Sequence, residues 1–508
     1  MAGEDTLTIV ERAVGFGCRF GLVDRDGPWT YADVVAQSMG VASRVLGERP
    51  DLDEHHDLRE ARVALLASPS LAYVAGQWGA WLAGGISVPL SPQQTPAEWE
   101  YLLDDSQATF AVVSPDLAGS FRALANARGM RVVVIDPPLL LSAPRPALPA
   151  IEPARRALML YTSGTTSRPK GVVLTHANIR AQVECLVGAW GWRADDRALL
   201  VLPLNHTHGV INVLTCALWI GAVCEIAPMF DPGLVWDRLA GGDITVFMAV
   251  PTIYRRLIAA WSDAPEGQQA LWSRGAARLR LFVSGSAALP VGVLEEWRAI
   301  TGHTLLERYG MTEIGMALSN PLDGERRPGY VGSALPGVDL RLVDEHGTDA
   351  AAGDPGEILV RGPAVFLEYW GRPDATGAAF SESGWFRTGD VAVVEGGAFR
   401  ILGRLSVDII KTGGEKVSAL EIEDVLREHP AIIDCAVVGL PDPEWGELVA
   451  AAVVLKPGAM LLLADLRNWA RALLSGPKLP RRMLVLDALP RNAMGKVAKA
   501  RLIQLFEA

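Results

Sequence analysis

The sequence predicts an α/β protein in two parts. We expect a large N-terminal domain of stacked mixed or parallel sheets with helices, residues 1–403, and a small α+β C-terminal domain, residues 404–508. The 508 residues, 50% of them hydrophobic, exceed one ordinary domain and allow a large core. Apolar runs of strand length alternate with helical periodicity, which is typical of βαβ units. At about 331–402 the pattern changes to short strands and glycine turns, which indicates a β-rich subdomain.

Each element follows from its local pattern. Residues 29–46 and 70–82 have apolar side chains at helical spacing, and residues 61–67 form a buried-strand run between them. Further strands and helices are expected at 86–90, 98–105, 110–113, 132–135, 158–161, 172–174, 198–203, 246–251 and 279–285, and in the C-terminal domain at 419–429, 435–439, 450–455 and 463–474. The prolines between 137 and 153 indicate a linker, and the apolar stretch 210–224 predicts a buried helix.

Composition excludes several classes of protein. The formal net charge of -11, with scattered cations, argues against nucleic acid or an anionic membrane as partner. The 5 cysteines are widely spaced without a Cys-x-x-Cys pair, so we expect reduced core thiols. No stretch reaches the ~20 apolar residues of a membrane span. The acidic N-terminus lacks a targeting pattern, so we expect a cytoplasmic protein.

The loop between the strands at 158–161 and 172–174 carries hydroxyl residues, Gly164 and Lys170. Hydroxyls, backbone amides freed by glycine and a cation together suit a phosphate group. An ordinary surface loop is the alternative. The mononucleotide template Gly-Lys-Ser/Thr is not met, because Gly171 follows Lys170.

Several separated motifs must be explained together with this loop. They are Pro203-Leu-Asn-His-Thr-His-Gly209, Ser284-Gly-Ser-Ala287, Glu307-Arg-Tyr-Gly-Met-Thr-Glu313, Thr388-Gly-Asp390, Gly403-Arg404 with Asp408, and Pro490-Arg-Asn-Ala-Met-Gly-Lys496. In this order and spacing the chain resembles, over essentially its whole length, the acyl-adenylate-forming family, which includes the acyl-CoA synthetases. The resemblance implies that ATP and a carboxylic acid give an acyl-adenylate and pyrophosphate, and that coenzyme A then displaces AMP.

The resemblance also assigns site residues. It places ATP against Thr162, Ser163, Gly164, Thr165, Thr166, Lys170, Ser286, Ala287, Glu307, Arg308, Tyr309, Asp390 and Arg404. Tyr309 is expected on the adenine face, and Asp390 with Arg404 on the ribose hydroxyls. Glu313 is expected to bind Mg²⁺, which prefers one or two carboxylates plus phosphate oxygens and water.

Catalysis and motion are implied in the same way. Lys496 is expected to neutralise the attacking carboxylate and the α-phosphate, with Thr312 near that phosphate and His206 at the acyl pocket, where it gates the thiol. The i,i+2 pair His206 and His208 is a poor metal site, because no third ligand is near in sequence. Asp408 is expected to be the hinge of a mobile C-terminal domain, which brings Gly413 and Gly414 to the thiol channel.

A further resemblance narrows the choice of carboxylic acid substrate. Leu306 to Gly329, Val250 to Arg256 and Val407 to Gly414 are similar to the malonyl-CoA synthetase branch. A dicarboxylate needs a second cation, because its distal carboxylate would otherwise be buried unpaired. Arg256 matches the arginine that this branch uses, and Arg255 is the alternative. The two point about 100° apart on a helix, so at most one should face the pocket.

Other functions stay open on the sequence. A short- or medium-chain fatty acyl-CoA synthetase, a carrier-protein-loading enzyme and a non-catalytic acyl or nucleotide binder are the alternatives. Ser167, Tyr330 and Glu415 depart from the family pattern and bear on loop mobility, nucleotide packing and thiol binding. The acid's identity between malonate and methylmalonate, and the oligomeric state, monomer or homodimer, are undetermined.

Overall fold

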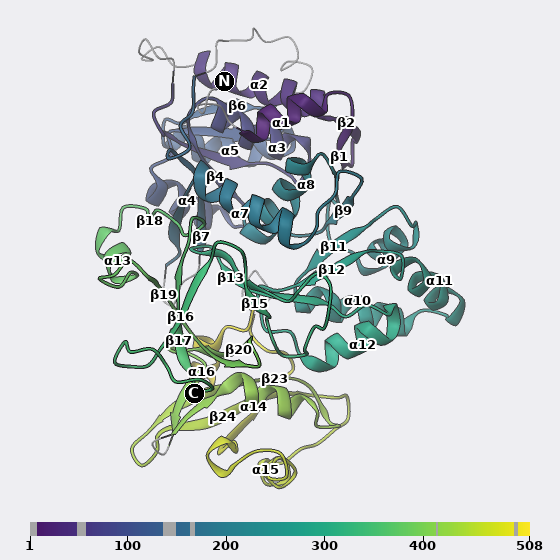
Figure 1. The fold of residues 1–508 in the computed structure, drawn as a ribbon, viewed down its shortest axis with the longest axis vertical. Coiled ribbons are helices and arrows are strands. Elements are labelled where there is room, and N and C mark those ends of the chain that lie inside the picture. The colour runs from purple at the N-terminus through teal and green to yellow at the C-terminus, as the bar shows by residue number, and fades with distance from the viewer. Residues whose placement is uncertain are drawn as a thin grey trace.

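The computed structural model describes residues 8–47, 57–135, 149–162, 168–412, 415–491 and 496–507. Its sheet topology confirms the predicted α/β fold. Figure 1 shows the large N-terminal part above and the C-terminal elements, from β20 onward, below it. Gly413 and Gly414 and most of the predicted linker fall outside the described residues.

A seven-stranded sheet carries the N-terminal alternation. Its order is β18 (Glu368–Tyr369), β8 (Lys170–Thr175), β7 (Arg156–Thr162), β4 (Ile86–Leu90), β3 (Arg62–Leu66), β5 (Phe110–Val113) and β6 (Arg131–Val134). The strands from β7 to β6 are parallel, and β8 and β18 are antiparallel additions. The connecting helices are α2 (Tyr31–Gly47), α3 (Leu71–Leu82), α4 (Pro96–Ser106) and α5 (Pro115–Ala127). Strands therefore alternate with helices as the sequence predicted.

A nine-stranded sheet follows. Its order is β15 (Ser333–Ala334), β14 (Gly315–Ser319), β13 (Leu306–Met311), β12 (Leu281–Ser284), β11 (Val246–Ala249), β9 (Arg197–Leu200), β10 (Val223–Ile226), β1 (Phe20–Asp24) and β2 (Gly27–Thr30). The pairings from β13 to β1 are parallel. The hairpin β1–β2 was not predicted. Its short strands lack a clear alternation, and the parallel pairing of β1 with β10 is fixed by tertiary packing.

Helices cover this second sheet. They are α1 (Thr8–Phe16), α7 (His176–Ala189), α8 (Cys216–Ile220), α9 (Pro232–Ala240), α10 (Pro251–Asp263), α11 (Glu266–Ala276) and α12 (Val291–Thr301). The predicted helix 210–224 begins as a π-helix, His208–Thr215, continues as α8 and ends at Ile220, because residues 223–226 form β10. Helices α9 to α12 gather on one side of the molecule (Figure 1).

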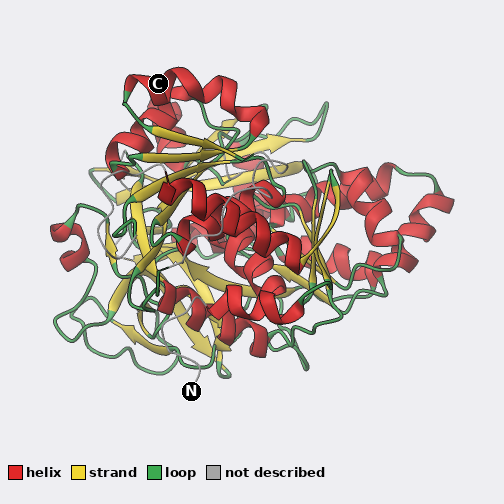
Figure 2. Ribbon diagram, turned by 90° about the horizontal axis from the view of Figure 1, so that it is seen from above, coloured by secondary structure: helices red, strands yellow, loops and turns green. Residues whose placement is uncertain are grey.

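Two smaller sheets complete the chain. The β-rich region holds an antiparallel sheet of β16 (Asp339–Val343), β17 (Gly356–Arg361), β19 (Phe386–Glu395) and β20 (Ala398–Arg404), with α13 (Pro373–Ala378) nearby. The C-terminal sheet contains β22 (Glu415–Ser418), β21 (Ile409–Thr412), β24 (Gly446–Leu455), β23 (Ile432–Asp442) and β25 (Arg482–Val485). Its helices are α14 (Ala419–Arg427), α15 (Leu463–Ala470), α16 (Lys499–Glu507) and the 3-10 turn Gly476–Lys478. Figure 2 shows helices and strands close to the C-terminus.

Burial agrees with these layers. Separate apolar clusters lie under the N-terminal sheets and inside the C-terminal group. Cys216, Cys224 and Cys435 are buried thiols as expected, whereas Cys18 is exposed and Cys185 is half-buried. Across the described ranges no helix combines the length and apolarity needed to cross a membrane.

An aromatic cluster supports the sheet edge that carries the site. The Trp297 ring on α12 stacks on Trp236 at 5.3 Å and meets Tyr254 of α10 at 4.8 Å and Phe282 of β12 at 5.2 Å. Trp297 is fully buried. The cluster therefore joins three helices, α9, α10 and α12, to the strand that ends at Ser284.

We predict that Trp297→Ala lowers the free energy of unfolding by about 3–5 kcal/mol, because it opens a cavity in this cluster. Thermal unfolding followed by circular dichroism would measure the change. Met460→Ala is the control, since its side chain is 93% exposed. Equal melting temperatures for the two variants would contradict the prediction.

Candidate active site

The predicted phosphate loop connects two antiparallel strands. β7 ends at Thr162, which pairs with Lys170 at the start of β8. Ser163, Gly164, Thr165, Thr166 and Ser167 lie outside the described residues. The Lys170 Nζ lies 5.0 Å from the Tyr369 ring centre, and the Tyr369 hydroxyl donates to Glu313 Oε1 at 2.9 Å. Lys170 and Glu313, predicted as separate site residues, are thus linked through Tyr369.

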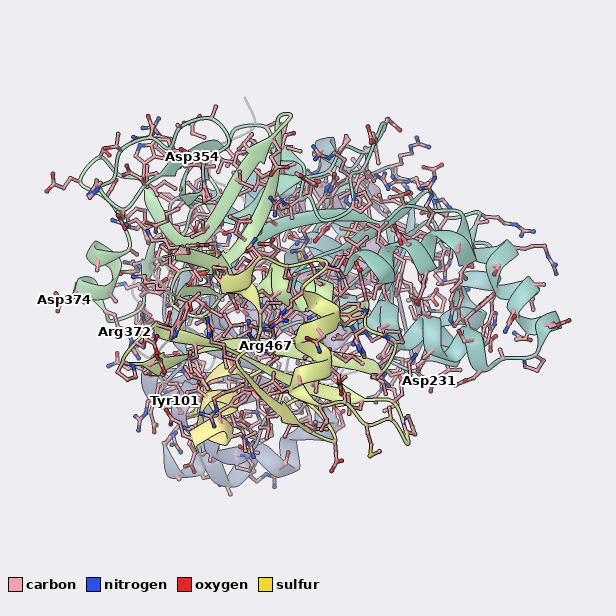
Figure 3. All side chains as sticks on the ribbon, turned by 90° about the horizontal axis from the view of Figure 1, so that it is seen from below. Tyr101, Asp231, Asp354, Arg372, Asp374 and Arg467 are labelled. Atoms are coloured by element: carbon pink, nitrogen blue, oxygen red, sulfur yellow. The ribbon has the colours of Figure 1, made fainter. Side chains whose placement is uncertain are left out.

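A polar network braces the base of this loop. The Tyr101 hydroxyl donates to the Pro169 carbonyl at 2.6 Å, and the Tyr161 hydroxyl to Asp105 Oδ2 at 2.9 Å. Arg372 donates to both Asp105 Oδ1, at 2.8 Å, and the Tyr101 oxygen, at 3.2 Å. Figure 3 shows Arg372 and Tyr101 on the same side of the molecule. Both ends of the loop are therefore held by side chains from other elements.

The Asp390 carboxylate is the centre of a second network. It accepts a hydrogen bond from the Tyr309 hydroxyl at 2.6 Å, and Arg404 donates to its two oxygens at 2.8 and 3.2 Å. Asp390 and Arg404 face each other because β19 and β20 pair at these residues. Burial and the Asp390 charge raise the pKa of Tyr309, so its hydroxyl keeps its proton. Tyr309, Asp390 and Arg404, which the sequence predicted to contact ATP, therefore lie together in the structure.

Arg308 is a buried cation beside the predicted acyl pocket. Its side chain is almost fully buried, and its Nε has no hydrogen-bond partner among the described residues. Its Nη2 lies 3.4 Å from Ser286 Oγ, which in turn lies 3.2 Å from His208 Nδ1. Burial lowers the pKa of Arg308 to about 9. A buried guanidinium with one long hydrogen bond is ready to receive an anion.

Ser286 and Ala287 follow the carboxyl end of β12. Ser286 has a φ of 71°, a left-handed conformation that a serine adopts at an energetic cost. Such strain clusters at binding sites. Ala287 is exposed at the same turn.

Glu307, expected at the nucleotide, is a buried carboxyl group on β13. Its Oε1 accepts from the Leu289 amide at 3.2 Å, and Oε2 has no partner in the described chain. Burial, together with the charge of Asp424 on α14 of the C-terminal group, raises the pKa of Glu307 to about 8. This carboxyl group supports strand β13 next to Arg308.

Lys496 comes from the far end of the chain. Desolvation and the charge of Arg404 lower its pKa, and the charges of Asp390, Arg308 and Glu313 also act on it. Lys496 also acts on His206, since burial and the Lys496 charge lower the pKa of His206 to about 4. The lysine of the C-terminal group therefore lies within electrostatic range of four predicted site residues and of His206.

The predicted hinge residue lies between β20 and β21. Asp408 accepts from the Arg404 amide at 3.0 Å and pairs with Lys499 Nζ at 2.5 Å. Lys499 also pairs with Glu423 of α14 at 2.9 Å. Since Lys499 is the third residue after Lys496, the Asp408 carboxylate is tied to the segment that carries Lys496.

The arginines of α10 point to different partners. Arg256 is exposed, and its guanidinium lies 4.6 Å from the Phe230 ring centre. Arg255 pairs instead with Asp434 of β23, at 3.4 Å. Arg255 is therefore engaged with the C-terminal group in this arrangement, which argues against its use as the alternative ligand for the acid.

Glu313 is the residue that the sequence predicted to bind Mg²⁺. Its side chain is almost fully buried, and burial raises its pKa. Within the described ranges no group of three His, Cys, Asp or Glu side chains could hold a metal by itself. A single carboxylate plus phosphate oxygens fits Mg²⁺, so the residues suit an ion that arrives with ATP. Thr312, beside Glu313, is half-buried at the end of β13.

Sequence reasoning missed two contributors. Tyr369 links Lys170 to Glu313, and Lys499 links Asp408 to α14. Both are single residues outside the quoted motifs, and their partners are distant in sequence. Their spacing gave no signal, because tertiary contacts alone bring them to the site.

Comparisons with known proteins agree with this geometry. The model of the family described as AMP-binding enzyme matches residues 11–370, and that of the AMP-binding enzyme C-terminal domain matches residues 421–496. The mitochondrial malonate–CoA ligase of Bos taurus is 45% identical over 97% of this chain and 89% of its own. That of Homo sapiens is 44% identical over 98% and 92%.

Two solved structures are similar over most of the chain. ATP-bound MatB from Rhodopseudomonas palustris is 34% identical, with a TM-score of 0.89 over 99% of both chains. A malonyl-CoA ligase with methylmalonyl-CoA and AMP bound is 37% identical, with a TM-score of 0.67 over 94% of this chain and 97% of that chain. The structure with 37% identity therefore superposes less well than the one with 34% identity.

One expectation is contradicted by these relatives. The proteins from Bos taurus, Mus musculus, Homo sapiens and Xenopus laevis are named mitochondrial, so the predicted cytoplasmic location is wrong on this comparison. A targeting segment is read separately from the folded enzyme. The composition of the folded chain therefore carried no information about location.

The pKa of His206 generates a pH prediction. Its folded-state pKa of about 4 lies below the ordinary value of 6.5, so the unfolded chain binds the proton first as pH falls. The stability from neutral His206 is full above about pH 6.5 and is lost as pH falls toward 4. We expect the melting temperature of His206→Gln to fall less than that of the wild type between pH 7 and pH 4.5. Parallel curves of melting temperature against pH for the two proteins would show that His206 does not contribute to the loss of stability.

Proposed function

The chain belongs to the AMP-binding enzyme family, and we propose on this premise that it is an AMP-forming acid–CoA ligase that joins malonate to coenzyme A. The observation that carries the proposal is that Lys496 lies near enough to Arg404, Asp390, Arg308 and Glu313 for their charges to act on its pKa. A non-catalytic binder has no need of a second lysine-bearing domain over the site. The choice of malonate as the acid rests on the relatives that are named malonate–CoA ligases.

In the first half-reaction a carboxylate oxygen of malonate attacks the α-phosphorus of ATP. The bond from that phosphorus to the bridging oxygen breaks, and pyrophosphate leaves with the electron pair. Both reactants are anions, so catalysis is chiefly positioning and charge neutralisation. Lys496 and Thr312 would stabilise the charge at the α-phosphate, while Lys170 and the loop at 162–170 would hold the outgoing phosphates.

In the second half-reaction the thiolate of coenzyme A attacks the acyl carbon. The bond from that carbon to the phosphate oxygen breaks, and AMP leaves. Asp390 and Arg404 would keep the ribose in place through both halves. Because the pKa of His206 is low, His206 is neutral at physiological pH and can line the acyl pocket without repelling the cations there.

Mg²⁺ would be held by Glu313 together with phosphate oxygens of ATP. When bound, it supplies positive charge that offsets the triphosphate. Tyr369 would orient the Glu313 carboxylate through its 2.9 Å hydrogen bond.

The distal carboxylate of malonate fits Arg308 well. Arg308 is buried beside Ser286, and no carboxylate forms an ion pair with it in the described chain. The apolar tail of a fatty acid at this place would leave the guanidinium buried without an anion, which is costly. This charge therefore favours the dicarboxylate over the fatty acyl alternative. Arg256, the residue expected from the sequence, is exposed at the neighbouring helix and would contact the acid at the pocket entrance.

We predict that Arg308→Met lowers kcat/KM for malonate by about 10²-fold or more, since one partner of a buried charge pair is lost, while butyrate turnover rises. Pyrophosphate release with malonate, methylmalonate, acetate and butyrate, with and without coenzyme A, measures this. Arg256→Ala is the matched variant. A larger malonate loss in Arg256→Ala would assign the carboxylate to Arg256, and no loss in either would favour a monocarboxylic acid. If the wild type releases no pyrophosphate with any of these acids, the result would support a non-catalytic binder.

We further predict that Lys496→Met lowers ATP–pyrophosphate exchange by about 10²- to 10³-fold, which is typical for loss of one stabilising group in a transition state. The better superposition on the ATP-bound relative supports this role, because Lys496 belongs to the arrangement seen here. Lys456→Met, at an exposed site, is the control. Equal exchange rates in the two variants would exclude Lys496 from the first half-reaction.

A further inference from the structure

The Asp434 carboxylate lies between arginines from two parts of the molecule. Its Oδ2 is 2.5 Å from Arg491 Nη2, and its Oδ1 is 3.4 Å from Arg255 Nη1. A third arginine, Arg427 of α14, is close enough for the Asp434 charge to act on its pKa. The Asp434 side chain is 15% exposed. One carboxylate therefore offsets the charge of several guanidinium groups.

The backbone of β23 orients the Asp434 side chain toward Arg255 and Arg491. The pairing of β23 with β24 shifts between Ile432 and Asp434, so Ile433 is an extra residue without a counterpart. A bulge of this kind re-aims the side chains beside it. The Cys435 amide donates to Asp434 Oδ1 at 3.0 Å and fixes the carboxylate further.

The two arginines join the parts that must meet in the first half-reaction. Arg255 lies on α10 of the large domain, next to Arg256. Arg491 pairs in an antiparallel bridge with Val497, the residue after Lys496, and the Ala498 amide donates to the Pro490 carbonyl at 2.8 Å. Asp434 thus connects the helix beside the acid pocket to the chain segment that holds the catalytic lysine.

The same segment is anchored on its other side. Lys499 pairs with Asp408 at 2.5 Å and with Glu423 at 2.9 Å. Those partners belong to the hinge and the C-terminal group, whereas Arg255 belongs to the large domain. The Asp434 link therefore depends on how the domains face each other.

We propose that Asp434 is a positioning residue for adenylation: by bridging Arg255 and Arg491, it stabilises the domain arrangement in which Lys496 reaches the α-phosphate. The role in catalysis rests on the proposed function. A contact made in one arrangement and broken in the other shifts the equilibrium between them by its differential free energy.

The first test separates the half-reactions. We expect Asp434→Asn to slow ATP–pyrophosphate exchange by roughly fivefold to twentyfold, the scale of a few partly exposed ion pairs. A rapid-quench chase with coenzyme A, started from enzyme-bound acyl-adenylate, should keep the wild-type rate. A merely structural role would slow both halves equally, and that result would overturn the proposal.

Matched variants sharpen this test. Asp434→Glu keeps the charge and should recover most of the exchange rate. Arg255→Gln alone should slow exchange, but should add little in the Asp434→Asn background, because the pair is already broken. Asp349→Asn, which removes the 2.8 Å pair with Arg341 inside the β-rich region, is the control. Additive effects of Arg255→Gln and Asp434→Asn, or an equal effect of the control, would overturn the bridge.

A second measurement does not depend on turnover. Spin labels at Leu271→Cys on α11 and Leu462→Cys beside α15, both at exposed sites, report the distance between the domains once Cys18 and Cys185 are replaced by serine. Asp434→Asn should reduce the fraction of molecules at the distance of this structure. An unchanged distribution would overturn the proposal even if no acid supports exchange, whereas inactivity of the wild type alone would bear on the proposed function.

Discussion

Several positive charges converge on one site, and the need to balance them is the constraint on which the rest of this structure depends. Arg308 is buried with its Nε unpaired in the described chain, Arg404 is committed to Asp390, and Lys496 joins them from the C-terminal group. Asp390 and Glu313 offset part of this charge. The remainder suits polyanionic ligands, because a triphosphate and a carboxylate provide the missing negative charge.

The same constraint explains why the molecule has two domains. A lysine placed permanently beside Arg308 and Arg404 would suffer lasting repulsion. Lys496 instead belongs to a group joined to the large domain through the turn at Asp408, where Lys499 pairs with the hinge carboxylate. Asp434 on β23 adds a link to α10. The domain motion that we propose would bring this charge to the α-phosphate for one step and withdraw it for the next.

Strand ends explain much of the remaining geometry. Ser284 ends β12, the motif from Glu307 to Met311 lies in β13, and Asp390 faces Arg404 across β19 and β20. Open α/β sheets place ligands at the carboxyl ends of their strands. The aromatic cluster around Trp297 holds β12 and α10 together, so packing beneath the sheet supports the residues above it.

The sequence by itself determined the α/β class, the family resemblance and the residues that carry charge, because strand and helix periodicity and motif order are local properties. The position of Asp390 beside Arg404 could also be anticipated from motifs. Tertiary structure alone decided that Arg308 is buried with its Nε unpaired among the described residues, that Arg255 turns to Asp434 and that Tyr369 links Lys170 to Glu313. These contacts join residues far apart in the chain, and burial and pairing depend on the packing of whole domains, which no short stretch of sequence encodes.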